Sequence, residues 1–131
     1  MIVSLHVASG AAAGSLLGTR RRAAFAGPLL HLAGDVTPHR DIQSFTFEMW
    51  SGIAALLLVA AIRGPFSPAT VGALAAALPD AEHKLRLPRP GGRQLFPSHR
   101  WPALHQEGGL GAALQLVATG TLLGWVLARR P

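Results

Sequence analysis

Apolar residues gather in five segments of this chain, and short polar stretches separate them. The segments cover residues 2–18, 23–36, 45–62, 67–78 and 108–128. The last segment carries no charged residue and has about the 20-residue length with which a helix spans a bilayer. None of the segments shows the strict alternation that is typical of a half-buried strand. The pattern therefore predicts an all-α protein, an integral membrane bundle of about five helices that folds as one domain over residues 1–131.

Small residues and segment lengths indicate how these helices would pack. Gly10 and Gly14 in the first segment have the small-xxx-small spacing that lets helices approach closely in membranes. The second and fourth segments are short for spanning a bilayer, so we expect them to be tilted, extended by flanking turns or buried among the others. A homo-oligomer would help to bury them.

A polar loop separates the fourth segment from the last. It covers residues 80–107 and follows Pro79, where we expect the fourth helix to end. The loop contains Pro88, Pro90, Pro97, Pro102 and the pair Gly91-Gly92. Because it is too long for a mere connection in so small a bundle, we expect it to be structured and to lie over a functional site.

The composition agrees with lipid as the solvent for much of the surface. Charged residues make up 14% of the chain, against about 25% in soluble domains, and the mean hydropathy is +0.34. There is no cysteine, which excludes disulfides and thiolate metal sites. The net charge is +6, but arginines flank the apolar segments and aromatic residues are too sparse for base stacking. We therefore expect a lipid bilayer as a partner and no nucleic acid.

All histidines and carboxylates of the chain can be placed at one end of such a bundle. If the chain crosses five times, the other end receives Arg20–Arg22, Arg63, Arg129 and Arg130 and no acid. The tight turn of three arginines indicates the cytoplasmic side, which puts the histidines at the extracytoplasmic face. Imidazole and carboxylate groups at one end predict a metal site, and without cysteine the ion would be Zn, Mn, Fe or Mg.

Candidate ligands lie one helical turn apart in the second segment. His31 and Asp35, at i and i+4, share one face of a helix, and His39 follows beyond Pro38, which disfavours a continuous helix. In one interpretation these residues aim two or three ligands at one ion. In the other, the imidazole is hydrogen-bonded to an aspartate that caps the helix end. An ionisable group within a membrane is costly and usually functional, which favours the first interpretation.

A second group of candidates follows the fourth segment directly. Asp80 and His83, three residues apart, can share an ion on one helical turn. Glu82 can act as a neighbouring partner or as a general base. The alternative interpretation is a solvated acidic helix start with Asp80 as its N-cap.

The remaining candidates lie in the polar loop and in the first segment. His99 and His105 flank a proline-containing turn, and Arg100 can neutralise an anionic substrate or a phosphoryl transition state. The alternative is a pair of exposed loop histidines that Trp101 anchors at the membrane interface. His6 lies in an apolar segment, where a lone histidine is more often a buried hydrogen-bonded group, but it lies at the same end as the others.

These residues form motifs that resemble those of the YdjM-like membrane-bound metal-dependent hydrolases, which are small multi-helix inner-membrane proteins. Leu5-His6 opens a helix rich in glycine and alanine. Residues 79–83 match a Pro-Asp-x-Asp-His motif with Glu82 in place of the second aspartate, and residues 99–105 match a His-Arg-x-x-x-His motif with one additional residue. His31 and Asp35 match a His-x-x-x-Asp motif, which is also similar to that of zinc-dependent phospholipase C. The resemblance implies a metal-dependent hydrolase of the bacterial inner membrane.

We therefore predict a membrane-bound metal-dependent hydrolase that cleaves a phosphoester or ester in a lipid-like substrate. One or two divalent ions, zinc above all, would activate a water molecule and polarise the scissile oxygen. Glu82 would accept the proton of the water, and Arg100 would hold a substrate oxygen. The predicted ligands are His31, Asp35, Asp80, His83, His99 and His105, with His6 and His39 in reserve.

Two other functions stay open at this point. A non-enzymatic protein that binds or transports a metal would need ligands through the depth of the bilayer. The far side has no acid or histidine and the last segment has no ionisable group, which favours the enzyme. A structural membrane subunit would keep its function without Asp80 or His83.

Overall fold

The computed structural model describes residues 1–85 and 89–129, and all regular structure in this part of the chain is helical. Three short helical turns lie between the last two long helices, at Pro90–Gly92 (η1), Pro97–Arg100 (α5) and Pro102–Leu104 (η2). The prediction of an all-α fold is confirmed, and each predicted apolar segment forms one long helix. These long helices are Val3–Leu17 (α1), Arg20–Val36 (α2), Phe45–Arg63 (α3), Pro68–Lys84 (α4) and Ala112–Ala128 (α6).

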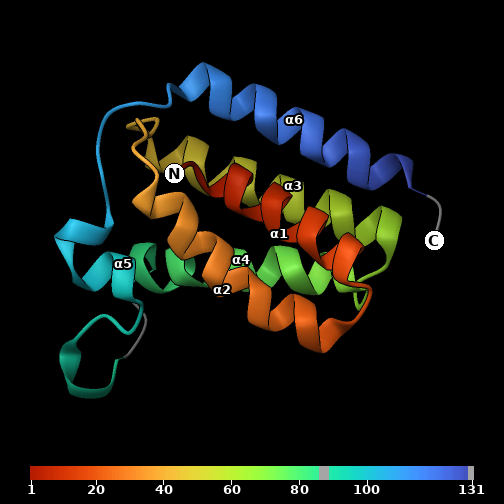
Figure 1. Cartoon of the computed structure of the whole chain (residues 1–131), viewed down its shortest axis with the longest axis horizontal. Coiled ribbons are helices and arrows are strands. Elements are labelled where there is room, and N and C mark those ends of the chain that lie inside the picture. Colours follow the sequence, from red (N-terminus) through yellow and green to blue (C-terminus); the bar gives the residue numbers. More distant parts are fainter. Residues whose placement is uncertain (86–88, 130–131) are drawn as a thin grey trace.

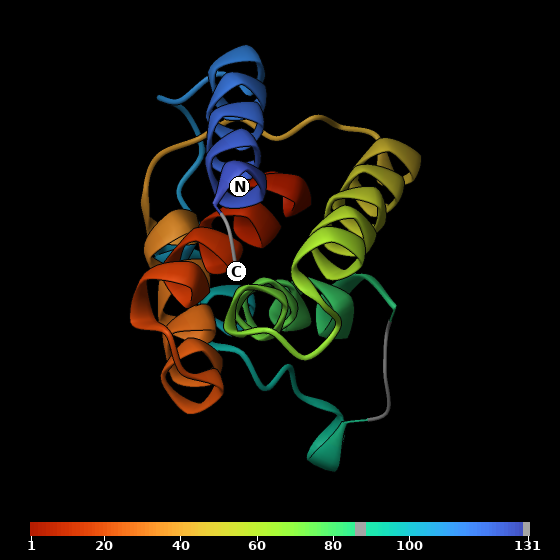
Figure 2. The same cartoon turned by 90° about the vertical axis from the view of Figure 1, so that its right-hand side faces the viewer.

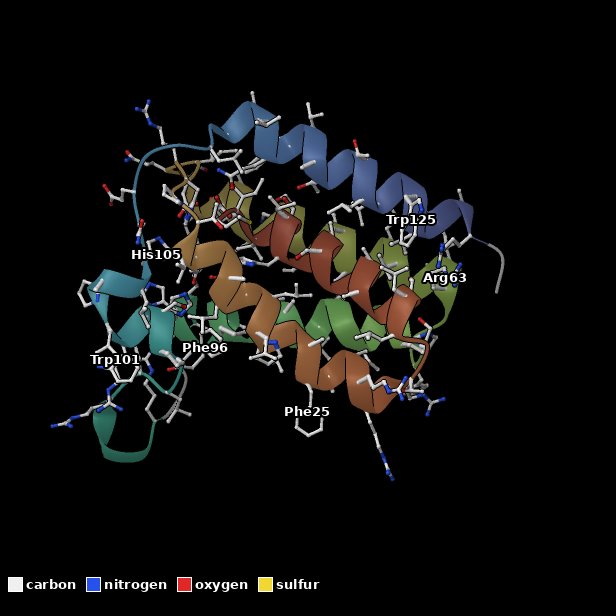
Figure 3. All side chains as sticks on the ribbon, in the orientation of Figure 1. Phe25, Arg63, Phe96, Trp101, His105 and Trp125 are labelled. Carbon is white, nitrogen blue, oxygen red and sulfur yellow. The ribbon has the colours of Figure 1, made fainter. Side chains whose placement is uncertain are left out.

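Successive long helices run in alternating directions along the bundle (Figure 1). Viewed along its length, the bundle has α1 in the middle, in contact with α2, α3, α4 and α6 (Figure 2). The start of α1 and the ends of α2 and α4 therefore share one end of the bundle. Arg63 and Trp125 lie at the opposite end, far from His105 (Figure 3).

The central position of α1 depends on its small residues. A Cβ atom on Gly10 would overlap the carbonyl oxygen of Gly72, and one on Gly14 would overlap the carbonyl oxygen of Pro68. The backbones of α1 and α4 are therefore in direct contact, as the small-xxx-small spacing predicts. The apolar core continues from this crossing to Val59 of α3 and Val126 of α6.

Two predicted helix boundaries are wrong. The fourth helix does not end at Pro79 but continues to Lys84, so Asp80 is a buried residue inside α4 and not an N-cap. A proline inside a helix removes one backbone hydrogen bond, and burial of Pro79 in the bundle offsets this loss. The second helix begins at Arg20 instead of residue 23, because Thr19 caps it by accepting a hydrogen bond from the Arg22 amide at 3.4 Å.

The outer faces of the helices carry large apolar side chains. Phe25 of α2 is 79% exposed and points away from the bundle (Figure 3), and Leu57 of α3 is 63% exposed. Among the described residues, only α3 is both long enough and apolar enough to cross a membrane, with a mean hydropathy of 1.8 over an 18-residue window. α1 and α6 are apolar but shorter. The membrane location of the bundle therefore stays a prediction.

The α1–α4 contact predicts a clear difference between two glycine substitutions. Gly72→Ala places a methyl group against the Gly10 backbone and should destabilise the fold by about 1–3 kcal/mol, as overpacking does. Gly120→Ala adds the same group at an α6 position with open space and should stabilise the protein by about 0.5–1 kcal/mol. Thermal unfolding of the purified variants measures both effects. Equal melting temperatures would contradict the close backbone contact.

Candidate metal centre

A buried carboxylate, that of Asp35, lies at the centre of the histidine-rich end of the bundle. The residue is 1% exposed. Its oxygens lie 3.2 Å from His6 Nε2 of α1, 3.0 Å from His31 Nε2 of its own helix and 3.5 Å from His99 Nε2 of α5. The backbone nitrogen of Met1 lies 3.3 Å from Oδ1. Three elements far apart in the sequence thus bring their imidazoles to one acid.

His31 is oriented by a backbone carbonyl of a neighbouring helix. Its Nδ1 lies 2.8 Å from the carbonyl oxygen of Ala76 in α4. A carbonyl oxygen only accepts, so Nδ1 carries a proton, and Nε2 on the other side of the ring faces the cluster. Histidines that bind metals are commonly fixed in this way by a backbone acceptor on the other ring nitrogen. His39 has the same arrangement, with Nδ1 donating to the Thr37 carbonyl at 2.7 Å.

The ring of His6 fits against α2 because a glycine leaves room for it. The rings of His6 and His31 stack with centroids 3.9 Å apart. A Cβ atom on Gly34 would lie 2.8 Å from His6 Cε1, closer than real contacts allow. Gly34, one residue before Asp35, therefore permits the close approach of α1 and α2 at the cluster.

Several polar atoms in the cluster are buried without a hydrogen-bond partner. They are His6 Nδ1, His31 Nε2, Asp80 Oδ2 and His99 Nδ1. His31 Nε2 lies near an Asp35 oxygen but not in the direction that a ring N–H requires. Buried polar atoms in proteins nearly always have a partner, and a bound ion is one explanation for a group of atoms that has none. Imidazole nitrogens and carboxylate oxygens are the ligand atoms that zinc accepts in cysteine-free sites, so the residues fit a divalent ion.

The candidate ligand atoms form overlapping groups. Within each group, all ligand atoms lie within 4.8 Å of one another. Asp35 belongs to two of the groups and so does His31, so the cluster offers enough ligands for one ion or for two. Among the described residues, the groups are His6, His31 and Asp80, then His31, Asp35 and His99, and finally Asp35, His39 and His105.

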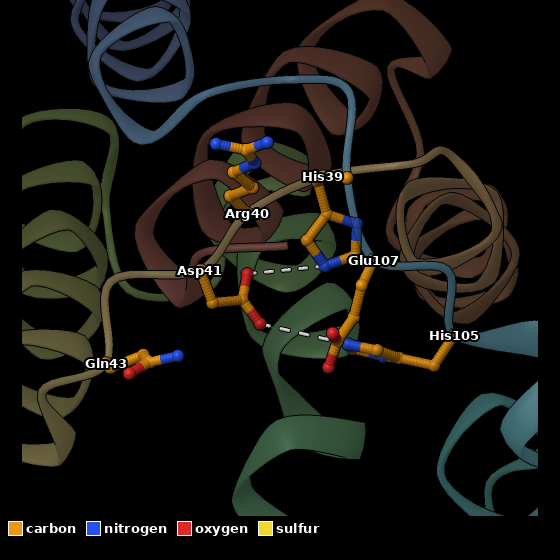
Figure 4. Close-up of a pocket in the computed structure, with 7 residues that line it drawn as sticks. His39, Arg40, Asp41, Gln43, His105 and Glu107 are labelled. Atoms are coloured by element: carbon orange, nitrogen blue, oxygen red, sulfur yellow. Dashed lines mark ion pairs between the residues drawn. The ribbon is translucent and has the colours of Figure 1, made fainter.

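Asp41 and His105 lie on the open side of the cluster. Asp41 is 3.3 Å from His39 Nε2 and 3.8 Å from His105 Nε2, beside a cavity of about 650 Å³ (Figure 4). Burial alone would raise the pKa of Asp41, but hydrogen bonding to His105 and His39 outweighs burial and lowers the pKa below its ordinary value. The carboxylates of Asp35 and Asp41 raise the pKa of His105 to about 9. Without an ion, His105 therefore holds a proton at neutral pH.

The segment after α4 folds back over the cluster and is tied to the end of α2. The His39 amide donates to the Gln106 carbonyl at 3.2 Å, and the Gly108 amide donates to the His39 carbonyl at 2.9 Å. Gln115 of α6 joins the same region by donating to the Arg40 carbonyl at 2.8 Å. This pairing positions His105 beside His39.

The structure brings together seven of the residues that sequence patterns predicted as ligands. They are His6, His31, Asp35, His39, Asp80, His99 and His105. His83 lies only at the margin: its ring centroid is 4.7 Å from that of His99, and its Nδ1 is hydrogen-bonded to Gln94. His83 belongs to none of the ligand groups found among the described residues. It lines the cavity beside the cluster.

The structure does not bring Glu82 and Arg100 to the cluster. Glu82 pairs with Arg89 at 2.8 Å, and its oxygens accept hydrogen bonds from the amides of Leu95 and Phe96 at 3.3 Å. It therefore fixes the loop and is not free to act as a base. Arg100 is exposed, with its guanidinium 5.5 Å from the ring of Trp101. The catalytic roles predicted for both residues stay predictions, because the structure places neither side chain at the cluster.

Two residues of the site were missed in the sequence patterns. Asp41 lies in the segment between α2 and α3, and its position two residues after His39 was the available signal. Ser98 precedes His99, and its hydroxyl donates to Asp35 Oδ2 at 2.6 Å. A serine beside a histidine is too common a neighbour to reveal such a contact.

No protein-family model, no curated protein and no solved structure matches this chain. The resemblance to the YdjM-like hydrolases therefore stays a prediction from its motifs.

The cluster predicts that the purified protein binds zinc and that the shared ligands matter most. Wild type should hold about one or two equivalents, because imidazole and carboxylate groups within reach of one another are ligands that a divalent ion accepts. Asp35→Asn removes a ligand that two groups share and should lower zinc to background, whereas Arg100→Ala and His83→Ala should retain it. Elemental analysis after zinc loading measures this. Full zinc content in Asp35→Asn, or background content in wild type, would contradict the site.

The charge arrangement around His105 predicts an imidazole that titrates late in the metal-free protein. Its pKa should lie near 9, above the ordinary 6.5. Because this pKa is raised, the ion pairs of His105 stabilise the metal-free fold fully below pH about 6.5 and are lost as the pH rises through about 9. NMR titration of the metal-free protein measures the value, and Asp41→Asn should lower it. A His105 pKa at or below 6.5 would contradict the ion pairs.

Proposed function

We propose that this chain is a membrane-embedded, metal-dependent hydrolase of the bacterial inner membrane, which cleaves a phosphoester in a lipid-like substrate. The observation that carries the proposal is the set of buried, unpartnered ligand atoms beside a cavity that opens to the surface. A purely structural ion would need no such cavity. A catalytic ion needs an open position for water and substrate.

The exposed apolar side chains support the membrane location. They lie on the outer faces of the four long helices that surround α1. Soluble monomers rarely expose large contiguous apolar patches. The other end of the bundle carries arginines, a distribution typical of residues flanking a membrane. The exposed residues include Phe25, Leu29, Trp50, Leu57, Ile62, Leu74, Leu78, Leu114 and Val117.

The chemistry requires few groups from the chain beyond the ligands. A divalent ion held by these residues would supply Lewis acidity for a phosphoryl oxygen and would lower the pKa of water toward neutral pH. Asp35 holds the imidazoles together, and Ser98 fixes the orientation of its carboxylate. Water adds to phosphorus, the bond to the leaving oxygen breaks, and the products are a phosphate and an alcohol. Asp41 is the carboxylate at the open side of the cluster, where it can orient the attacking water by accepting a hydrogen bond from it.

Cationic groups in the lining of the cavity would attract an anionic substrate. The cavity beside the cluster has a volume of about 300 Å³, and its lining includes the carboxylates of Asp41 and Asp80 as well as His99, His105 and Lys84. Lys84 at the end of α4 provides a positive charge for phosphoryl oxygens. Bound ions would neutralise the carboxylates and add to this attraction.

Metal transport is the rival function, and the distribution of ligands disfavours it. In the described residues, the halves of the long helices that lie away from the cluster carry neither histidine nor acid. A path for an ion through the bundle would need such groups along its length.

The proposal predicts zinc-dependent hydrolysis of a simple phosphoester. Zinc-loaded wild type should cleave p-nitrophenyl phosphate, and Asp35→Asn should lower kcat/KM by about 100-fold or more, since even outer partners of metal ligands contribute 10–100-fold. Arg100→Ala, matched as an exposed loop variant, should leave kcat/KM unchanged. Release of nitrophenol in detergent or nanodiscs measures the rate. Full zinc binding without hydrolysis of any phosphoester would instead favour the metal-binding function.

A further inference from the structure

An apolar cavity of about 210 Å³ lies between α3 and α4, apart from the polar cavities. Ile53 and Leu56 of α3 and Leu74 and Leu78 of α4 line its two sides, and Val7 of α1 lies at its base. Ile53, Leu74 and Leu78 are partly exposed, so the cavity is a groove open to the outside of the bundle. Ala77 is a small residue among the larger side chains of the lining, and Val3 of α1 packs over Gly52 at the edge of the groove.

The groove ends at the candidate metal centre. Asp80 lines this groove and also lines the polar cavity that contains His99, His105 and Lys84. Its Oδ2 is buried and has no hydrogen-bond partner, and its Oδ1 lies 3.6 Å from His99 Nε2. The end of α4 therefore carries, next to one another, the apolar groove, the side chain of Lys84 and the candidate metal ligands.

We propose that this groove binds the hydrocarbon chain of an anionic amphiphile whose phosphoester head group lies at His99, His105 and Lys84. The proposal rests on the proposed function for the reaction, and it names the substrate: a long-chain alkyl phosphate or a lipid with such a chain. The groove is below the volume of about 300 Å³ at which sites for drug-sized ligands begin, so it fits one chain and not a whole lipid. It opens beside α3, the helix that is long and apolar enough to cross a bilayer. In a membrane, the hydrocarbon chains of lipids would therefore lie next to the opening of the groove.

Hydrolysis of substrates that differ only in chain length tests the groove. With zinc-loaded wild type in nanodiscs, KM should fall from ethyl phosphate to dodecyl phosphate by up to about fourfold for each methylene group that the groove buries. The value of kcat should change little, because the chain lies away from the reacting atoms. A KM that is independent of chain length would overturn the proposal, even if hydrolysis itself is observed.

A variant that fills the groove provides the second arm of the test. Ala77→Leu should abolish the preference for the long chain and leave zinc content and the cleavage of p-nitrophenyl phosphate at the wild-type level. Ala113→Leu makes the same change at an exposed α6 position that lines none of the described cavities, and it should behave as wild type. An unchanged chain preference in Ala77→Leu would overturn the proposal.

A binding measurement separates failure of the groove from failure of the proposed enzyme. If no phosphoester is cleaved, equilibrium binding of dodecylphosphonate and ethylphosphonate to the zinc-loaded protein still reports on the groove. Tighter binding of the dodecyl compound, weakened by Ala77→Leu, would support the groove. Equal binding would overturn it.

A second copy of the chain is the competing occupant of the groove. Leu78→Cys introduces the sole cysteine at its rim. Efficient disulfide-linked dimers in nanodiscs that hold two copies would show that another copy covers the groove and would overturn the proposal. A thiol that stays monomeric and becomes protected from alkylation by dodecylphosphonate would support it.

Discussion

The carboxylate of Asp35, buried among imidazole rings, is the interaction on which the rest of this structure depends. A buried charge without compensation is costly, so an acid at this depth requires partners from every direction. Those partners come from the start of α1, from α2 itself and from the segment before α6. The helix ends must therefore converge at one point, and the loop must fold back over it. The packing of α1 against α4 through Gly10 and Gly72 holds the helices close enough for this convergence.

The polar ligand residues lie at one end of the bundle, and the apolar interior occupies the rest of its length. Small residues and a few branched side chains fill the interior away from the cluster, and large apolar side chains lie on the outside. In the proposed membrane setting, the ligands would lie at the rim of the bilayer, where water and lipid are both accessible. The groove between α3 and α4 would then connect hydrocarbon with the polar end through one residue, Asp80. A site with this geometry selects substrates by where their polar and apolar parts lie.

The apolar pattern was sufficient to predict the long helices and the end of the bundle at which the ligands gather. Pairs one turn apart, such as His31 and Asp35, were also predictable because helix geometry alone places them on one face. The pattern failed at Pro79, where burial outweighs the local tendency of proline to end a helix. It failed again at Glu82, since the backbone amides that engage this acid come from a loop whose path no local pattern describes. Asp41 was missed although His39 lies only two residues before it, because its second partner, His105, belongs to a distant segment.

The central place of α1 has a consequence for how the protein is made. α1 leaves the ribosome before the other described helices, yet it contacts each of the other long helices, α2, α3, α4 and α6. Ser4 and His6 are buried in the folded protein, but they stay unburied until α2, α4 and α6 have been synthesised and pack against α1. During that interval the nascent chain exposes polar groups within an apolar segment, a state in which misassembly competes with folding. The ligand cluster therefore cannot assemble before the segment that carries His99 and His105 has been synthesised.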